Sequence, residues 1–367
     1  MTRKQGIRAV FFLLILFMIM WILGSVIGMP KDADIVLNTR RFNALYSEEK
    51  DIWDGIFIGT SLADRAWAAP LAWEEHGMAV YPMATDGQPF VLSASIIEEV
   101  LKYQDISFVM VELHGTRPKT LKASDARMRK VTDNMKQSST RFNAISKTVA
   151  HMDQWYPGYY DETFANRMSY YIPFLKYHKR VTSEDDFYPE DFWPGISTMK
   201  GVYVADRHVA ANPVKYRAGD AYIEPGEEPK MLLDDLFSFA EENDIQLIFI
   251  TAPTGMSEEV QGYANGVVQY VKDHGYPVLN FYDETVYAEC GIDGKTDFID
   301  MKHLNTAGAY KFTQYVGAWL KENFEIEDHR GDKQYESWDK ALEEYRVFYE
   351  EALVGIEEWK TNNLKKN

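Results

Sequence analysis

The sequence predicts an α/β protein with a mostly parallel sheet, helices on both faces, and a membrane-spanning helix at the N-terminus. Three observations predict this: an uncharged apolar run near the start, five short apolar segments with helical patterns between them, and one long interruption of that rhythm. Alternation of strands and helices is typical of parallel sheets, because each crossover between parallel strands needs a long connection. The 367 residues suffice for one large domain or two modest ones.

The N-terminal run, residues 9–29, contains no charged side chain and follows Arg3, Lys4 and Arg8. About twenty apolar residues span the hydrocarbon core as a helix, and flanking positive charge keeps that end in the cytoplasm. We therefore expect residues 1–8 in the cytoplasm, a transmembrane anchor over 9–29, and the rest outside it, as a single-pass cell-membrane protein. A cleaved signal peptide is the alternative, but the run is long for one and lacks a clear cleavage site.

Composition excludes several classes of function. The formal net charge of −17 disfavours nucleic acid as a partner. The single cysteine, Cys290, excludes an intramolecular disulfide framework and a multi-cysteine zinc site, and we interpret it as structural. The sequence has neither a phosphate-binding P-loop nor a dinucleotide fingerprint, so no cofactor is predicted.

Residues 30–51 are predicted to form a polar stalk or an entry segment, and residues 52–325 the main domain. Short runs rich in branched and aromatic residues are typical of strands buried on both faces. These runs predict strands at residues 55–60, 78–84, 106–113, 245–252 and 276–282. Helical patterns between and after them cover residues 90–103, 230–243, 258–274 and 306–323.

Two further segments lie outside this rhythm. Residues from about 119 to 229 separate the third and fourth strands and are rich in Tyr and Trp. A structureless loop of that length is improbable, so we predict a mainly helical insertion that covers the carboxyl edge of the sheet; a packing extension without a functional role is the alternative. Residues 326–367 show apolar spacings of an amphipathic helix, which either packs on the domain or binds a partner.

A single hydroxyl group follows the first predicted strand, in the stretch "FIGTSLADRAW". Ser61 stands where the apolar run ends and a helix-compatible segment begins. It is either an ordinary helix N-cap or a nucleophile. In an open parallel sheet, ligands collect at the carboxyl ends of the strands, which is the edge where Ser61 lies.

The stretch "DFIDMKHLNTAGAYKF" brings Asp300 and His303 to the same edge, before a helix that Asn305 or Thr306 can cap. A neutral imidazole takes the proton from a serine hydroxyl, and a carboxylate on the other ring nitrogen holds its tautomer. The backbone N–H of Ser61 can then face a developing oxyanion. The three residues predict a Ser-His-Asp mechanism for acyl chemistry.

The blocks "GTS" and "DMKHLNTAG" resemble the first and last motif blocks of the SGNH/GDSL hydrolases, over residues 52–325. The single N-terminal anchor is similar to the surface-polymer acylation branch, which includes teichoic-acid D-alanylation and alginate-acetylation proteins. The resemblance implies a three-layer, flavodoxin-like α/β/α fold. It also implies Ser61 as nucleophile, His303 as base and Asp300 as its orienting carboxylate. Gly87 of "MATDGQPF" matches the glycine that donates to the oxyanion hole.

The third family block is Gly-x-Asn-Asp, and this chain has "VELHGTRP" there, without the Asn. Gln88 or His114 is the candidate for the missing donor beside Ser61 and Gly87. Loss of one donor costs about 10²–10³ in rate, which weighs against efficient free hydrolysis and leaves acyl transfer open. The resemblance implies a membrane-anchored extracytoplasmic esterase or O-acyltransferase for a cell-surface glycan or teichoic-type polymer, with a multi-spanning membrane O-acyltransferase as a candidate partner.

Three alternatives remain open on the sequence. Asp297, Asp300 and His303, together with Glu112 and His114, can form a mixed His-carboxylate metal site, although no paired-His spacing occurs. Aromatic side chains of the insertion can stack on sugar rings or simply fill a core. The chain can also be a non-catalytic, membrane-tethered scaffold on a hydrolase-like fold, which the absent Asn favours and the complete triad disfavours.

Overall fold

A five-stranded parallel sheet forms the centre of the protein in the computed structural model, which describes all residues except 1, 32, 183–186, 204–208, 216–218 and 364–367. The strand order is β2-β1-β3-β4-β5. All five predicted strands are present, and the predicted α/β class with a parallel sheet is confirmed. The strands are β1 (Gly55–Ile58), β2 (Val80–Pro82), β3 (Phe108–Glu112), β4 (Gln246–Thr251) and β5 (Val278–Asn280).

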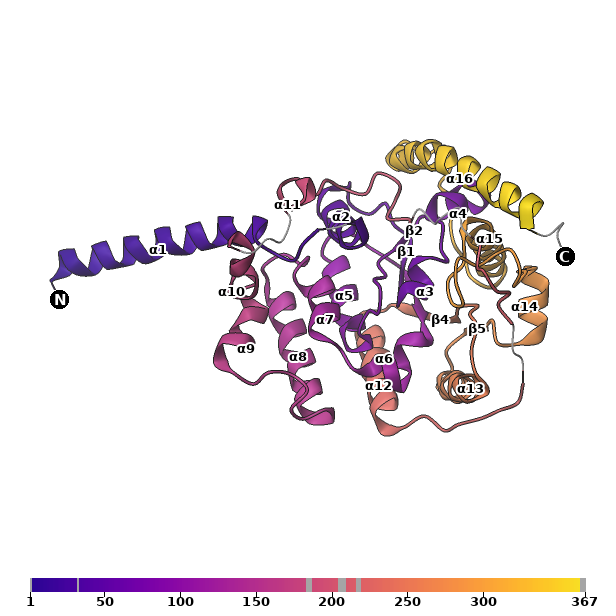
Figure 1. Cartoon of the computed structure of the whole chain (residues 1–367), viewed down its shortest axis with the longest axis horizontal. Coiled ribbons are helices and arrows are strands. Elements are labelled where there is room, and N and C mark those ends of the chain that lie inside the picture. Colours follow the sequence, from indigo (N-terminus) through magenta and orange to yellow (C-terminus); the bar gives the residue numbers. More distant parts are fainter. Residues whose placement is uncertain (1, 32, 183–186, 204–208, 216–218, 364–367) are drawn as a thin grey trace.

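Helices connect the strands and extend the domain at both ends (Figure 1). Those between and after the strands are α3 (Ser61–Asp64), α4 (Ala69–His76), α5 (Ser93–Val100) with its preceding 3₁₀ turn η1 (Phe90–Leu92), α12 (Glu227–Glu242), α13 (Glu258–Asp273), α14 (Glu284–Cys290) and α15 (Thr306–Asn323). Before and after the domain core lie α1 (Arg3–Val26), α2 (Ala33–Ser47), η4 (Lys333–Tyr335) and α16 (Glu336–Asn363).

Helices cover both faces of the sheet, as the continuous burial of its strands requires. Phe57 of β1 and Ile248 of β4 are aligned through β3, so their side chains share one face, and Phe249 points to the other. Phe57 stacks on Phe312 of α15 at a centroid distance of 6.5 Å. Phe237 of α12 meets Phe249 edge-on at 5.8 Å. The aromatic side chains therefore fix α15 and α12 on opposite faces.

The segment predicted as a stalk or entry segment contains the helix α2, which packs on the domain. Within α2, Val36, Phe42, Ala44 and Leu45 are buried, because they recur at helical spacing and pack on the body of the protein. The tail helix begins later than its sequence pattern suggested, at Glu336, and packs on α4 and α15. Both terminal segments thus belong to the folded unit.

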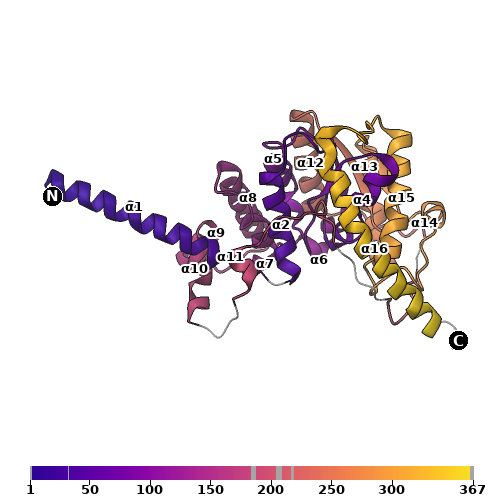
Figure 2. The same ribbon diagram turned by 90° about the horizontal axis from the view of Figure 1, so that it is seen from above.

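The insertion after β3 contains mostly short helices and a long extended stretch. Its elements are η2 (Leu113–Thr116), α6 (Pro118–Leu121), α7 (Asp125–Thr132), α8 (Ser139–Trp155), α9 (Phe164–Tyr171), α10 (Phe174–Tyr177), η3 (His178–Val181) and α11 (Pro189–Phe192). Helix α8 packs on α5, which places these helices beside the sheet's own helical layer (Figure 2). The extended stretch then reaches the loop between α14 and α15. There Ala210 N–H donates to Phe298 O, and Val214 N–H donates to Gly294 O, both at 2.7 Å.

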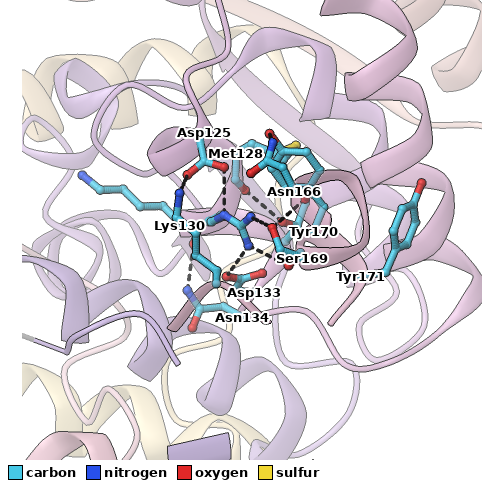
Figure 3. A network of polar contacts seen from close by, with 12 residues as sticks. Asp125, Met128, Lys130, Asp133, Asn134, Asn166, Ser169, Tyr170 and Tyr171 are labelled. Carbon is cyan, nitrogen blue, oxygen red and sulfur yellow. Dashed lines mark hydrogen bonds and ion pairs between the residues drawn. The ribbon is translucent and has the colours of Figure 1, made fainter. Parts of the chain in front are cut away.

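A buried arginine, Arg129, organises the polar interior of the insertion. Figure 3 labels several residues around it, among them Asp125, Ser169 and Tyr170. The Arg129 guanidinium donates to Asp125 at 3.0 Å, to the carbonyl of Ser169 at 2.9 Å and to the hydroxyl of Ser169 at 2.7 Å. The guanidinium also lies over the ring of Tyr170, 4.6 Å from its centroid. Helices α7 and α9 are therefore joined by charge-assisted hydrogen bonds instead of apolar contacts alone.

Helix α1 projects from the domain as an isolated helix (Figures 1 and 2). Within its segment Arg3–Gly24, the most apolar 18-residue stretch has a mean hydropathy of 2.5, and none of that stretch is buried in the protein. One N-terminal helix is therefore long and apolar enough to cross a membrane.

Candidate active site

The candidate nucleophile, Ser61, lies in the turn that joins β1 to α3. Gly59 in this turn has φ of 150°, and a Cβ there would lie 2.5 Å from the Cβ of Glu112, so only glycine fits. Thr60 is extended, and its hydroxyl accepts the N–H of Leu62 at 3.3 Å, which makes Thr60 the N-cap of α3. Ser61 is therefore the first helical residue, and its hydroxyl does not cap the helix.

Two fully buried charged side chains hold this turn in place. Glu112, at the end of β3, accepts the backbone N–H of Thr60 at 3.2 Å and its hydroxyl at 2.8 Å. Burial raises the pKa of the Glu112 carboxyl, while these hydrogen bonds oppose that rise. Arg41 of α2 pairs with Asp64 of α3 and donates to Ala84 O, after β2, at 2.6 Å. The position of Ser61 is thus tied to three different segments.

The structure brings Ser61, His303 and Asp300 together in one chain of hydrogen bonds. Ser61 Oγ lies 2.8 Å from His303 Nε2, and His303 Nδ1 lies 2.7 Å from Asp300 Oδ2. Ionised Asp300 accepts only, so His303 donates from Nδ1 and its Nε2 is the acceptor for the serine proton. The His303 side chain is 16% exposed and that of Asp300 is 51% exposed, so the pair opens to solvent from one side.

A tight loop before α15 positions this pair. Ile299 N–H donates to His303 O at 2.9 Å, which closes the loop at its base. At its tip, Asp300 Oδ1 accepts the backbone N–H groups of Lys302 at 2.7 Å and His303 at 2.9 Å. Burial opposes ionisation of Asp300, but the hydrogen bonds from His303 and Lys302 outweigh it and hold its pKa below the usual range. Asn305 caps α15 by accepting Gly308 N–H at 3.1 Å.

Three donors next to the serine have no hydrogen-bond partner among the described residues: the backbone N–H groups of Ser61 and Gly87, and Nδ1 of His114. Gly87 belongs to the loop after β2, which is joined to the serine turn because Thr85 N–H donates to Gly59 O at 3.2 Å. Gly87 has φ of 60°, which favours glycine, and a Cβ there would clash with Arg127. Free donors near a nucleophile are what an oxyanion hole requires.

His114 follows β3 and is neutral. Burial, followed by the charges of Arg117, Lys302 and His303, lowers its pKa to about 2. The Arg117 guanidinium contacts His114 Nε2, and because arginine only donates, this nitrogen is the acceptor. The imidazole proton therefore resides on Nδ1, the buried nitrogen without a partner.

Gln88 supports the backbone of the serine turn through its side-chain amide. Its Oε1 accepts Gly59 N–H at 2.9 Å, and its Nε2 donates to Met83 O at 2.9 Å. The side chain is 3% exposed. The amide of Gln88 thus fixes the end of β1 against the loop after β2. Of the two further donors that the sequence suggested, His114 is the one whose donor atom, Nδ1, has no hydrogen-bond partner among the described residues.

Basic side chains gather around the triad although the protein is strongly acidic. Arg65 lies one turn after Ser61, its guanidinium 4.4 Å from the centroid of Tyr203. Arg127 lies against Gly87, and the charge of Lys302 acts on His114. Arg65, Arg127 and Lys302 form no ion pair with the described carboxylates. Unpaired cations around a nucleophile attract an anionic ligand.

Two parts of the insertion reach this edge of the sheet: α7, through Arg127 against Gly87, and the extended stretch, through Tyr203 over Arg65. The Tyr/Trp-rich segment itself lies elsewhere. Tyr160 and Tyr170 are buried inside the insertion, where the hydroxyl of Tyr160 donates to Ala123 O at 2.5 Å. Tyr160 and Tyr170 therefore form part of a core, whereas Tyr159 and Phe164 of the same segment are exposed. Tyr203 is the ring over which the Arg65 guanidinium lies.

The residues of the alternative metal site are separated. Asp297 accepts from Lys311 Nζ at 2.7 Å and from the hydroxyl of Thr296 at 3.0 Å, whereas Asp300 orients His303. Glu112 is committed to the serine turn. Within the described parts of the chain, no three His, Cys, Asp or Glu side chains are grouped so that they can hold a metal ion.

Sequence reasoning missed Arg41, Asp64 and the supporting role of Glu112. Arg41 and its partner Asp64 are separated by a strand, so no local spacing links them. Glu112 carried one usable signal: it is a charged residue at the end of an otherwise apolar buried strand, and such a carboxylate must find donors. Its donors, however, are in Thr60 of another strand's turn, which the sequence alone does not show.

Comparison with known proteins adds no identity to this geometry. No protein-family model matches the chain, and no curated protein matches it significantly.

Proposed function

We propose that this protein is a membrane-anchored serine acyl-esterase or O-acyltransferase of the SGNH/GDSL type, acting outside the cytoplasm on a cell-surface glycan or teichoic-type polymer. The observation that carries the proposal is the chain of hydrogen bonds from Ser61 through His303 to Asp300. It is supported by the finding that Thr60, and not Ser61, caps α3. A serine hydroxyl held on a histidine and free of a capping role is suited to nucleophilic attack.

In the proposed reaction, Ser61 Oγ attacks the carbonyl carbon of an acyl ester while His303 Nε2 takes its proton. The leaving alcohol takes that proton from His303 as its bond to the acyl carbon breaks, which leaves the acyl group on Ser61. Water or a polymer hydroxyl then attacks the acyl-serine, with His303 again accepting and returning a proton. Asp300 stays ionised and stabilises the imidazolium in both halves.

The oxyanion that forms in each half would be stabilised by the N–H groups of Ser61 and Gly87 and by His114 Nδ1–H. The family motif has an Asn where this chain has His114 close behind β3, and a neutral imidazole donor can perform the same task. Its low pKa supports this role, because a neutral ring with its proton fixed on Nδ1 needs no reorganisation.

Two coarser features agree with the proposal. The strand order β2-β1-β3-β4-β5 supports the flavodoxin-like arrangement that the proposal implies, because the order reverses between β1 and β3, where ligands bind in such sheets. Ser61 and Glu112 lie at the carboxyl ends of these two strands. The positive residues before α1 favour a cytoplasmic N-terminus, which would place this site outside.

The substrate class rests on the unpaired cations. Arg65, Arg127 and Lys302 lie at the serine edge in a protein with a formal net charge of −17, and none forms an ion pair with a described carboxylate. The opposing charge that acts on Arg65 and Arg127 is that of Asp86, which is itself paired with Lys130 at 3.0 Å. A neutral ester gains nothing from them, whereas a phosphate- or carboxylate-bearing polymer does. The cations therefore support an anionic polymer as donor or acceptor of the acyl group.

A fluorophosphonate probe, which reacts with activated serines, tests the proposal on the full-length protein in detergent. We expect labelling of the wild type at Ser61, confirmed by mass spectrometry, and none of Ser61→Ala. The matched control is Ser257→Ala: Ser257 begins helix α13 as its N-cap and has no histidine partner. Labelling should persist in this control, with a stability loss of about 1 kcal/mol.

A non-catalytic scaffold gives the opposite result. It would leave Ser61 unlabelled in the folded wild type and would keep its cellular role in the Ser61→Ala variant. Equal labelling of wild type and Ser61→Ala would show that the probe reacts elsewhere, and would also contradict the proposal.

A further inference from the structure

A clamp of buried side chains fastens the apolar helix α1 to the insertion. Arg180 donates to Gly28 O at 2.9 Å and pairs with Asp191 at 2.8 Å, and Asp191 Oδ1 also accepts Lys31 N–H at 3.1 Å. Arg180 is 4% exposed and Asp191 is 1% exposed. Because the clamp begins two residues after Val26, the end of α1, no flexible linker separates the helix from the domain (Figure 2).

An apolar collar surrounds the base of α1. We define this collar as the exposed side chains of α10, η3, α11 and the residues next to them: Leu175, Val181, Phe187, Phe192 and Trp193. Trp193 is 81% exposed and Val181 is 59% exposed. The rings of Phe192 and Trp193 are in contact, with centroids 5.9 Å apart, and Phe187 lies under the guanidinium of the clamp residue Arg180 at 4.6 Å. The elements α10 and α11 that carry the collar both contact α1.

The length of α1 determines at which depth of a membrane this collar lies. The uncharged part of α1 runs from Ala9 to Val26. As a helix it measures about 27 Å, close to the thickness of about 30 Å of the hydrocarbon core. If α1 spans the bilayer, its end lies at the lipid headgroups, and the rigid clamp brings the collar to the same level. Aromatic side chains are enriched at this level of a membrane because their rings are amphipathic. Lys179 is exposed beside the collar and can meet lipid phosphates, whereas its neighbour Lys176 pairs with Asp125 at 3.2 Å.

We propose that the collar is a membrane-docking surface, which lies in the headgroup region of the leaflet next to the domain and holds the domain in one orientation on the bilayer. The occupant of the surface is lipid, because the apolar helix that must be covered by lipid ends at this surface. The inference depends on α1 as a membrane span and is independent of the acyl chemistry proposed above. It predicts that the domain contacts the membrane with the α10–α11 side and not with α16.

The test uses full-length protein in vesicles of phosphatidylcholine and phosphatidylglycerol. An environment-sensitive fluorophore is attached to Trp193→Cys and, separately, to Phe187→Cys; the matched control is Val347→Cys on α16, where Val347 is 57% exposed. The native Cys290 is buried, and the wild type carried through the same labelling measures its background. Lipids with a spin label just below the headgroup act as the quencher.

We expect at least threefold stronger quenching by the spin-labelled lipid at positions 193 and 187 than at position 347. Thermal melts should be unchanged for all three variants, since each replaced side chain is exposed or partly exposed. Equal quenching at the collar and at position 347 would overturn the proposal. Protection of the collar probe from aqueous iodide without lipid quenching would overturn it too, because a protein partner would then cover the surface.

Discussion

The serine turn after β1 and the Arg129 network of the insertion both contain buried polar groups, but they differ in whether their hydrogen-bond donors have acceptors within the protein. In the Arg129 network the guanidinium donates to Asp125 and to both oxygens of Ser169 (Figure 3). Around the serine, the N–H groups of Ser61 and Gly87 and Nδ1 of His114 remain without partners in the described structure.

This difference distinguishes a site for binding from a site for stability. An unpaired buried donor costs free energy in the unbound protein, so a fold retains several together only where something else supplies the acceptor. In the Arg129 network the donors have acceptors, and the one buried oxygen without a hydrogen bond in the described structure, Asp133 Oδ2, lies 3.7 Å from the Arg129 guanidinium. Such a network contributes its free energy in the unbound protein, as rigidity of the helices that it joins. The comparison predicts that mutations at the serine edge change reactivity and spare stability, and that mutations in the network do the reverse.

The largest expected effect is that of His303→Ala. Without the imidazole, Ser61 loses its base, and we expect its reaction with the fluorophosphonate probe to slow by about 10⁴–10⁶ with an unchanged thermal melt. The matched control is His329→Gln. His329 lies 2.8 Å from Asp54, so it forms a second His-carboxylate pair, but has no serine beside it. If both variants slow the reaction equally, the triad assignment is wrong.

The Arg129→Met substitution tests the other side of the comparison. Removing the guanidinium takes one of two arginine partners from the largely buried side chain of Asp133, which keeps Arg141 at 3.3 Å, and leaves the carbonyl of Ser169 without its donor. We expect the free energy of unfolding to fall by about 3 kcal/mol, the lower end of the cost of breaking a buried pair. Urea denaturation measures this, and probe labelling of the protein that remains folded should match the wild type. Arg167→Met is the control. Its partner Asp153 is exposed, and we expect a change below about 1 kcal/mol. Equal losses in the two variants would contradict the network's role.

Substitutions of His114 test whether a residue of the serine edge acts in catalysis or in stability. His114→Leu removes the Nδ1 donor and should lower kcat for a small acyl ester by about 10²–10³. His114→Asn places an amide N–H near the position of Nδ1 and should recover most of that loss. The readouts are kcat with KM, and a thermal melt for each variant. A purely structural role would make the two variants equally slow, or would lower the melt in parallel with kcat.

Whether a feature of these two regions could be predicted from the sequence depends on how far apart the contacting residues lie along the chain. The parallel sheet was predictable because its strands are continuous apolar runs with helical patterns between them. Ser61 and the Asp300–His303 pair were predictable as candidates, since each is a short local pattern at one edge of that sheet. The contacts of Arg41 with Asp64 and Ala84 were not, because no sequence spacing links them. The same reason made residues 30–51 look like a stalk: their buried face packs on segments far along the chain.

The smallest expected effect concerns the unpaired cations, and it tests whether the serine edge is adapted to anionic substrates. Lys302 is exposed and forms no ion pair with a described residue, so its attraction to a substrate is screened by water and salt and amounts to about 1 kcal/mol. We expect Lys302→Ala to lower kcat/KM for a negatively charged succinyl ester by about fivefold at low salt. A neutral acetyl ester should react as before.

The matched control is Lys295→Ala, which removes the same charge from an exposed position of the loop that leads to Asp297, outside the serine edge. The measured quantity is the ratio of kcat/KM for the charged ester to that for the neutral ester, at about 20 mM and about 500 mM salt, where the screening length falls from tens of ångströms to a few. At high salt the wild type and Lys302→Ala should give the same ratio, because screening already removes the attraction that the substitution removes. If the ratio changes equally in both variants, the effect is one of net charge. If it changes in neither, the cations play no part in substrate choice, and the proposal of an anionic polymer substrate is contradicted.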